Sequence, residues 1–148
     1  MPVISIKTKV KGAAASVFAL FDEQLFDYLA PPYWLAKKIA YEGSDVGDKV
    51  KMQFQIPFKS VMEVEIVSIQ KNENKLWFID VGLELPFGLK HWQHQHIVHA
   101  HNECSIIEDR ITYKTQNLLL DWAFYPFFYM AFWGRKKPYQ QYFGTCKK

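Results

Sequence analysis

Residues 117–143 read NLLLDWAFYPFFYMAFWGRKKPYQQYF, and this stretch decides how the rest of the chain must be arranged. Asp121 is the only acidic or basic residue between Leu118 and Trp133, and eleven aromatic residues lie between Leu118 and Phe143. A helix that is apolar on nearly every side lies either in a protein core or in a membrane. Since the run is shorter than the roughly 18 residues that a membrane span needs, we expect a core helix gripped by a sheet.

Capping signals frame this predicted helix. Asn117 can accept hydrogen bonds from the first free amides, and Gly134 followed by the cationic residues 135–137 suits the negative end of the helix dipole. Pro126 removes one backbone donor halfway along, so we expect a kink there.

The predicted helix has one less apolar stripe, formed by Asp121, Tyr125 and Tyr129 at i, i+4 and i+8. We expect this stripe on the partly wet outer side, and the alternative turns the two hydroxyls inward toward a ligand. The apolar residues are expected in the core, where some also line a cavity: Phe124, Phe127, Phe128, Met130 and Phe132.

The composition favours one domain spanning residues 1–148, because 49% hydrophobic residues in a chain of this length can fill one core. The net charge is only +3, and Lys and Arg form no run longer than residues 135–137. We therefore expect no nucleic-acid partner.

The two cysteines, Cys104 and Cys146, are expected to be reduced thiols of a cytoplasmic protein, since a domain that builds its own hydrophobic core does not need a disulfide bond for stability. Residues 7–21 imitate a secretory signal, but Asp22 and Glu23 follow without a cleavage pattern. We expect an amphipathic first helix there and no transmembrane segment in the chain.

The order of the elements predicts an α+β fold. Period-two alternation predicts an opening strand over residues 3–10, followed by short helices over 13–21 and 23–29. Six more strands are predicted at 36–42, 48–56, 59–70, 76–85, 90–101 and 104–115, with a break at Pro57. A curved antiparallel sheet of about seven strands around the C-terminal helix would enclose a space between them.

Two motifs on the last strands add a resemblance: W-x-H-x-H at Trp92, His94 and His96, and D-x-I-x-Y at Asp109, Ile111 and Tyr113. With the element order and the aromatic helix that runs into Arg135, the chain resembles the START-like superfamily, also called SRPBCC or Bet v 1-like. Within it, the chain is similar to the small bacterial branch related to polyketide cyclase/dehydrase-like proteins and to START-like domains of some cell-division inhibitors. The resemblance implies a helix-grip fold with a hydrophobic cavity for lipids, sterols, quinones or polyketides, and it implies binding more often than catalysis.

All five histidines lie in residues 91–101, HWQHQHIVHAH. A two-residue turn at 102–103 would set Trp92 opposite Tyr113, His94 opposite Ile111, His96 opposite Asp109 and Val98 opposite Ile107. We expect this face to point into the cavity, with His96 and Asp109 hydrogen-bonded and the pKa of the histidine raised. The pair would be structural, a ligand anchor, or the acid and base of an enzyme.

A metal site is a weaker alternative. His94 and His96 have a metal-binding spacing, but a third ligand would have to be Asp80, Asp109 or Asp121, so we expect neither a metal nor another cofactor.

Three functions stay open: a module that binds a hydrophobic or amphipathic molecule, a cyclase or dehydratase using His96 and Asp109, and a protein-interaction domain with a filled cavity. We expect binding rather than catalysis. The oligomeric state is open, and so is a transient contact of Trp133 and residues 135–137 with anionic lipid. The expected ligand-lining residues are Trp92, His94, His96, Asp109, Ile111, Tyr113, Phe124, Phe127 and Phe128.

Overall fold

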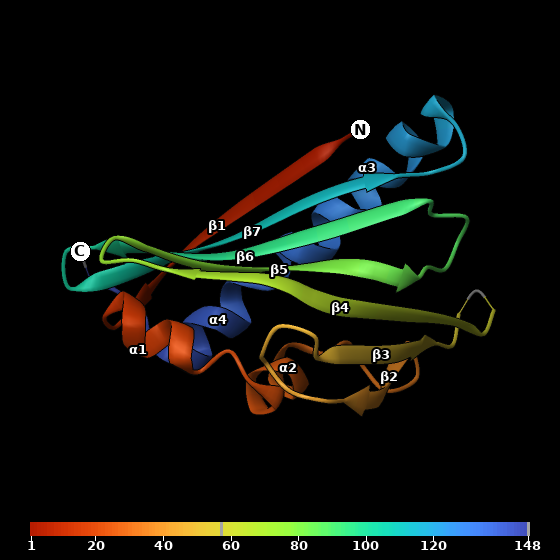
Figure 1. Ribbon diagram of the computed structural model, residues 1–148. Helices are drawn as coiled ribbons and strands as arrows, with labels where there is room; N and C mark the ends of the chain where they lie inside the picture. The colour runs from red at the N-terminus through yellow and green to blue at the C-terminus, as the bar shows by residue number, and fades with distance from the viewer. Residues whose placement is uncertain (57, 148) are drawn as a thin grey trace.

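The computed structural model describes residues 1–56 and 58–147, so the break predicted at Pro57 lies outside the described residues. Seven strands form one sheet (Figure 1). The elements follow in the order β1 (Val3–Lys11), α1 (Ala14–Ala19), α2 (Glu23–Leu29), β2 (Ala36–Tyr41), β3 (Lys49–Phe54), β4 (Ser60–Lys71), β5 (Lys75–Glu84), β6 (His91–His101), β7 (Cys104–Lys114), α3 (Leu118–Trp133) and α4 (Lys136–Phe143).

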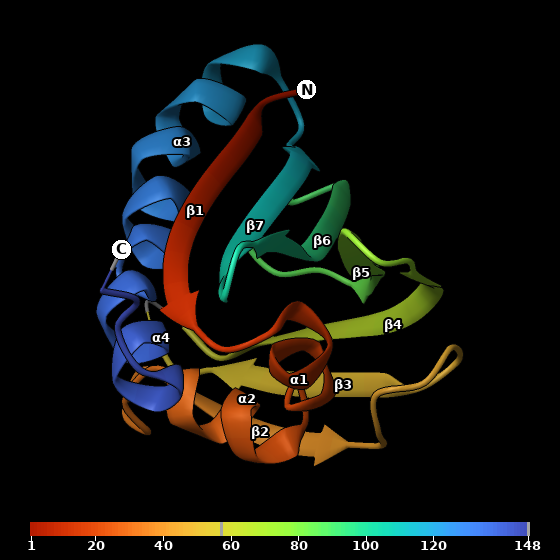
Figure 2. The ribbon, with the colours of Figure 1, turned by 90° about the vertical axis from the view of Figure 1, so that its left-hand side faces the viewer.

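The sheet is antiparallel throughout, in the order β1-β7-β6-β5-β4-β3-β2. Six strands therefore follow one another as a meander, and only β1 crosses over, to pair with β7. Figure 2 shows the sheet curling from β1 round to β2. Helices α3 and α4 lie alongside β1. The α+β helix-grip fold predicted from the sequence is confirmed, and its strands end within two residues of the predicted bounds.

Helix α3 packs its narrow buried side onto the sheet. Phe128 and Phe132 lie in a cluster with Trp92 of β6 and Tyr113 of β7, and the Tyr113 hydroxyl donates to the main-chain oxygen of Asp121. Asn117 caps the helix as predicted, because its side chain accepts from Leu120 N at 2.9 Å. These contacts lie in the space between the sheet and α3 where the sequence predicted a cavity.

The opposite side of α3 faces solvent, which corrects two predictions. Asp121 is 1% exposed and accepts from the backbone and hydroxyl of Thr115, so it does not belong to a wet stripe with Tyr129. Phe127 is 65% exposed and Met130 64%, so neither side chain lies in the core where the sequence predicted it. A helix that is apolar on all sides carries no periodic signal that tells its inner side from its outer side.

A second cluster closes the other end of the molecule. Val10, Val98 and Ile107 from three strands meet α1 and α4, and Tyr139 of α4 is fully buried among them. The sequence predicts the end of the long helix at Gly134 but does not predict α4 as a separate helix. The break falls at Gly134 and Arg135, where the chain turns so that α4 lies along β1 (Figure 2).

The structure joins Cys104 to Cys146 in a disulfide, which contradicts the predicted pair of free thiols. Cys104 begins β7 and Cys146 follows α4, and their Cα atoms lie 6.0 Å apart. The bond therefore ties the C-terminal segment to the start of β7. Among the described residues, none of the helices has the length and apolar character needed to cross a membrane.

Adjacent phenylalanines of α3 give a matched test of its orientation. Phe128→Ala should lower the free energy of unfolding by about 3–5 kcal/mol, because the ring is buried against Trp92 and Tyr113. Phe127→Ala should change it by less than about 0.5 kcal/mol, since that ring is exposed. Urea unfolding measures both, and equal losses in the two variants would contradict the orientation described.

Candidate functional site

The register of the histidine strand is the one predicted. Trp92 pairs with Tyr113, His94 with Ile111, His96 with Asp109 and Val98 with Ile107. The turn residue Asn102 has a positive φ of 56°, a conformation that asparagine tolerates better than most residues. The face that carries His94 and His96 points toward the helices, because both rings meet aromatic residues from that side.

The hydrogen-bond partners of the two histidines differ from the prediction. His94 Nε2 bonds the Asp109 carboxylate at 2.8 Å, and His96 Nε2 bonds Asp80 of β5 at 2.8 Å. Each histidine thus binds the carboxylate that stands directly opposite the other histidine, since Asp80 pairs with His94 in the ladder. The predicted His96–Asp109 hydrogen bond is wrong, and His96 Nδ1 lies 3.9 Å from Asp109 Oδ1. Diagonal neighbours in a sheet are within reach of long side chains.

Asp109 is the centre of the buried polar cluster. Its side chain is 2% exposed, and the Oδ1 atom lies 3.4 Å from the donating Tyr139 hydroxyl and 3.6 Å from Arg135 Nη1. Arg135 also lies over the Phe132 ring, 4.7 Å from its centre. The carboxylate therefore holds together β6, β7, α4 and the turn between α3 and α4.

The protonation states follow from this geometry. Burial lowers the pKa of His94 to about 4, helped by repulsion from His96 and opposed by Asp109. Burial alone would raise the pKa of Asp109, but the His94 hydrogen bond and the Arg135 charge bring it to about 2. Near neutral pH a neutral His94 donates to an ionised Asp109. At His94 the desolvation outweighs the neighbouring carboxylate, which by itself would raise the pKa.

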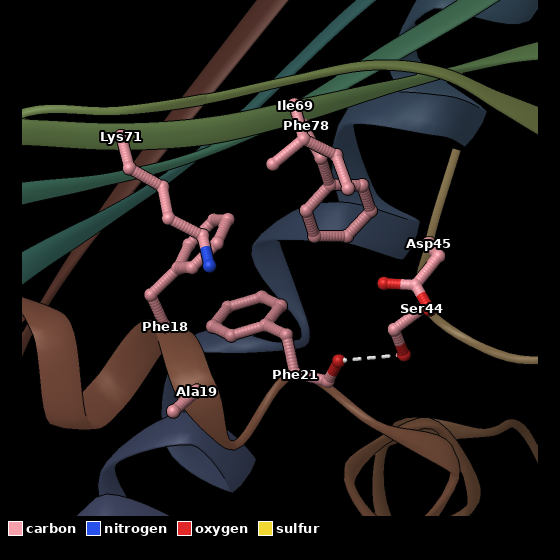
Figure 3. A pocket seen from close by; sticks show the side chains of 8 residues that line it. All are labelled: Phe18, Ala19, Phe21, Ser44, Asp45, Ile69, Lys71 and Phe78. Atoms are coloured by element: carbon pink, nitrogen blue, oxygen red, sulfur yellow. Dashed lines mark hydrogen bonds between the residues drawn. The ribbon is translucent and has the colours of Figure 1, made fainter.

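His96 connects this cluster to a pocket. Its ring stacks on Phe78 with centroids 4.1 Å apart and meets the edge of Phe21 at 6.3 Å. Both phenylalanines line a pocket of about 180 Å³ between α1, the β2–β3 loop and strands β4 and β5 (Figure 3). The lining residues are Phe18, Ala19, Phe21, Ser44, Asp45, Ile69, Lys71 and Phe78.

One ring nitrogen of His96, Nδ1, can still accept a hydrogen bond. Among the described residues, Nδ1 of His96 is buried and has no hydrogen-bond partner. Because Nε2 is engaged by Asp80, the Nδ1 of a neutral ring accepts a hydrogen bond. A buried polar atom without a partner is costly, and a ligand group could satisfy it.

The predicted ligand-lining residues divide into two groups. His94, His96 and Asp109 form the polar cluster, whereas Trp92, Ile111, Tyr113 and Phe128 lie in the packed core and Phe124 packs against its edge. Sequence reasoning missed the pocket residues Phe21 and Phe78 and, in the cluster, the roles of Arg135 and Tyr139. Of these cluster residues, only Asp80 could have been recognised from the sequence, because it is the one carboxylate in the apolar strand segment LWFIDVG.

Comparison with solved structures places this arrangement in a known fold. Norcoclaurine synthase from Thalictrum flavum, in complex with dopamine and hydroxybenzaldehyde, is 15% identical with a TM-score of 0.65 over 99% of this chain and 89% of that one. Ara h 8.0201, a Bet v 1-like protein, is 14% identical with a TM-score of 0.62 over 95% and 96% of the two chains. The chain has the Bet v 1-like helix-grip fold.

A third structure with this fold is the protein Ms6760 from Mycobacterium smegmatis, with 13% identity and a TM-score of 0.66 over 99% of this chain and 93% of that chain. No protein-family model matches the chain, and no curated protein matches it in sequence. The Bet v 1-like resemblance predicted from the sequence is thus confirmed for the fold. Membership of the small bacterial branch stays a prediction.

Three residues on the concave face of this Bet v 1-like sheet could hold a metal ion. Asp80, His94 and His96 each offer a ligand atom, and the three atoms lie within 4.8 Å of one another. Each histidine Nε2 already bonds a carboxylate, and the Arg135 charge beside Asp109 would repel a cation nearby. The expectation of no metal stays a prediction.

The buried neutral His94 predicts how stability depends on pH. An unfolded histidine has a pKa near 6.5, so the unfolded chain gains a proton below about pH 6.5 that native His94 accepts only near pH 4. Stability should fall as the pH drops through this window. Between about pH 7 and about pH 5, the wild type should lose about 2 kcal/mol more unfolding free energy than His94→Gln.

Denaturant unfolding at a series of pH values measures this loss. His91→Gln is the matched control, because His91 lies on the opposite face of β6 and should leave the wild-type slope unchanged. A wild-type slope equal to that of His94→Gln would contradict a neutral, buried His94.

Proposed function

We propose that this protein binds a small amphipathic molecule whose ring-sized part enters the pocket between α1 and strands β4 and β5. The observation that carries the proposal is the buried Nδ1 of His96, which has no hydrogen-bond partner among the described residues and belongs to a ring that contacts the pocket-lining Phe21 and Phe78. A ligand that passes these rings could donate a hydrogen bond to that nitrogen and place its apolar part against the phenylalanines.

The walls of the pocket suit an amphipathic ligand. Phe18, Phe21 and Phe78 supply aromatic surface, and their rings meet one another at centroid distances of 6.0–6.3 Å. Lys71 and Asp45 bring opposite charges to the rim, where Figure 3 shows their side chains on opposite sides. Polar groups at both ends of an apolar slot orient a bound molecule.

The volume limits the ligand. Sites for drug-sized molecules usually span about 300–1,000 Å³, and this pocket has about 180 Å³. Of the classes that the resemblance implies, a quinone ring or one ring of a polyketide therefore suits the pocket better than a whole sterol. The dopamine and hydroxybenzaldehyde in the norcoclaurine synthase structure are also one-ring molecules.

A cyclase or dehydratase reaction is the second candidate. The Asp80–His96 hydrogen bond favours it, because a carboxylate that orients an imidazole leaves the other nitrogen ready to move a proton. The Asp partner is then Asp80 rather than the predicted Asp109. Turnover that His96→Gln abolishes would favour this enzyme over a carrier.

The disulfide also bears on the predicted cytoplasmic location. A cytoplasmic protein was predicted from two free thiols, and the Cys104–Cys146 disulfide removes that support. Disulfides persist mainly in oxidising compartments. The location therefore stays a prediction that thiol labelling of protein from the native cells would check.

Filling the pocket tests the binding proposal without touching the core. Ala19 lines the pocket and is exposed, so Ala19→Trp should occupy the space and weaken binding of a one-ring quinone or phenol at least tenfold. Ala15→Trp is the matched control, because Ala15 is exposed on the same helix and lines no part of this pocket. Calorimetric titration of a ligand panel measures both variants.

His96→Gln then tests the anchor. It should weaken the same ligand about fivefold or more, through loss of the hydrogen bond to Nδ1. No binding of any panel member, together with a native mass equal to that of the bare chain, would contradict the proposal and favour a protein-interaction domain with a filled interior. Binding that survives Ala19→Trp would place the ligand elsewhere.

A further inference from the structure

The outward side of α3 is a continuous apolar surface. Leu119 is 81% exposed, Met130 64% and Trp122 57%, and they lie on the side opposite the buried Phe128. We call this surface the α3 face. It consists of Leu118, Leu119, Trp122, Ala123, Pro126, Phe127, Tyr129, Met130 and Trp133.

The α3 face carries no charge over the whole helix. Asp121, the one acidic or basic residue in α3, is 1% exposed and turned toward Thr115. Sixteen residues at about 1.5 Å each give an apolar strip of roughly 24 Å. Exposed apolar surfaces of this kind mark a place where a protein meets another surface.

Lysines flank both ends of the α3 face. Lys114 precedes the helix and lies beside Lys90, whose backbone N–H donates to its carbonyl at 2.7 Å. Lys136 and Lys137 follow the helix, and Lys136 Nζ donates to the Lys7 carbonyl. Lys90, Lys114 and Lys137 are all exposed, so cationic groups stand at each end of the apolar strip. Lys114 Nζ also lies 3.8 Å from the buried Asp121 carboxylate, which leaves Lys90 and Lys137 as the two lysines here without an acidic partner among the ion pairs of the described residues.

We propose that the α3 face docks onto the surface of a bilayer that contains anionic phospholipid. The apolar side chains would enter the boundary between headgroups and acyl chains, and the lysines at both ends would lie against the headgroup phosphates. Trp122, Tyr129 and Trp133 suit this boundary, because each combines an apolar ring with a polar N–H or O–H group.

The charges argue against a second copy of the chain as the occupant. In a symmetric dimer with antiparallel α3 helices, Lys114 of one copy would meet Lys136 and Lys137 of the other. In a parallel arrangement, each lysine would meet its own copy. Like charges oppose each other in both cases, whereas an anionic surface attracts all of them.

Docking goes beyond the proposed ligand binding and does not depend on it. The pocket residues Phe18 and Phe21 belong to α1 and the loop after it, away from the α3 face (Figure 2). The two proposals can therefore fail separately, because vesicle binding is measured without ligand.

Vesicle flotation tests the docking proposal with the full chain. The wild type should float with vesicles of roughly three parts phosphatidylcholine to one part phosphatidylglycerol, and much less with phosphatidylcholine alone. The double variant Leu119→Glu/Met130→Glu should bind at least tenfold more weakly. Both side chains are exposed, so the fold should persist.

Val46→Glu is the matched control, since Val46 is 59% exposed in the β2–β3 loop on the far side of the molecule from α3 (Figure 2). It should float like the wild type. Lys90→Gln/Lys137→Gln should weaken binding to the mixed vesicles and leave binding to phosphatidylcholine unchanged, and it keeps the Lys114–Asp121 ion pair.

Two outcomes would overturn docking on a bilayer. One is equal flotation of the wild type and the Leu119→Glu/Met130→Glu variant. The other is a wild-type dimer in sedimentation velocity that this variant converts to monomers while neither protein floats, because the α3 face would then be an interface between copies.

Discussion

The buried carboxylate of Asp109 is the constraint on which the arrangement of the molecule depends. An ionised group with 2% of its side chain exposed cannot stay in the core without partners, and three elements supply them. His94 donates from β6, Arg135 brings a positive charge from the turn after α3, and Tyr139 approaches from α4. The position of α4 and the break at Gly134 follow from where that charge lies.

The same cluster divides the concave side of the sheet into two halves. Toward α3, Trp92, Phe128 and Phe132 pack closely and leave the helix to bury only one side. Toward α1, His96 leans away from Asp109 to reach Asp80, and its ring forms a stack with Phe78. The pocket begins at that stack, so the polar cluster and the aromatic pocket are two ends of one side-chain network.

The sequence predicted the fold and the strand register because both rest on local signals. Period-two alternation, glycine and proline breaks and a two-residue turn at Asn102 determine which residues face each other, and the observed pairs agree. It could not predict which carboxylate each histidine binds. Register places Asp80 beside His94 and Asp109 beside His96, but the side chains cross to the diagonal partners.

Two other misses have a similar cause. The direction of an apolar helix cannot be read from its own residues, so Phe127 and Phe128 looked alike although one is exposed and the other buried. The pocket forms where α1, a loop and two strands meet in space. The spacing of residues within any one of these segments cannot predict such a contact between segments. Cys104 and Cys146 are far apart in sequence, and only the path of α4 along β1 brings them together.

The most direct test of this account is a nitrogen NMR titration of the histidine side chains in the folded protein. We expect His94 to stay neutral at pH 6 with its proton on Nε2, since its pKa is about 4 and Nε2 bonds the Asp109 carboxylate. Asp109→Asn should change the His94 signals more than those of His91, which lies on the other face of β6. A His94 that titrates near its ordinary pKa of about 6.5, unaffected by Asp109→Asn, would contradict a buried carboxylate cluster at the centre of the molecule.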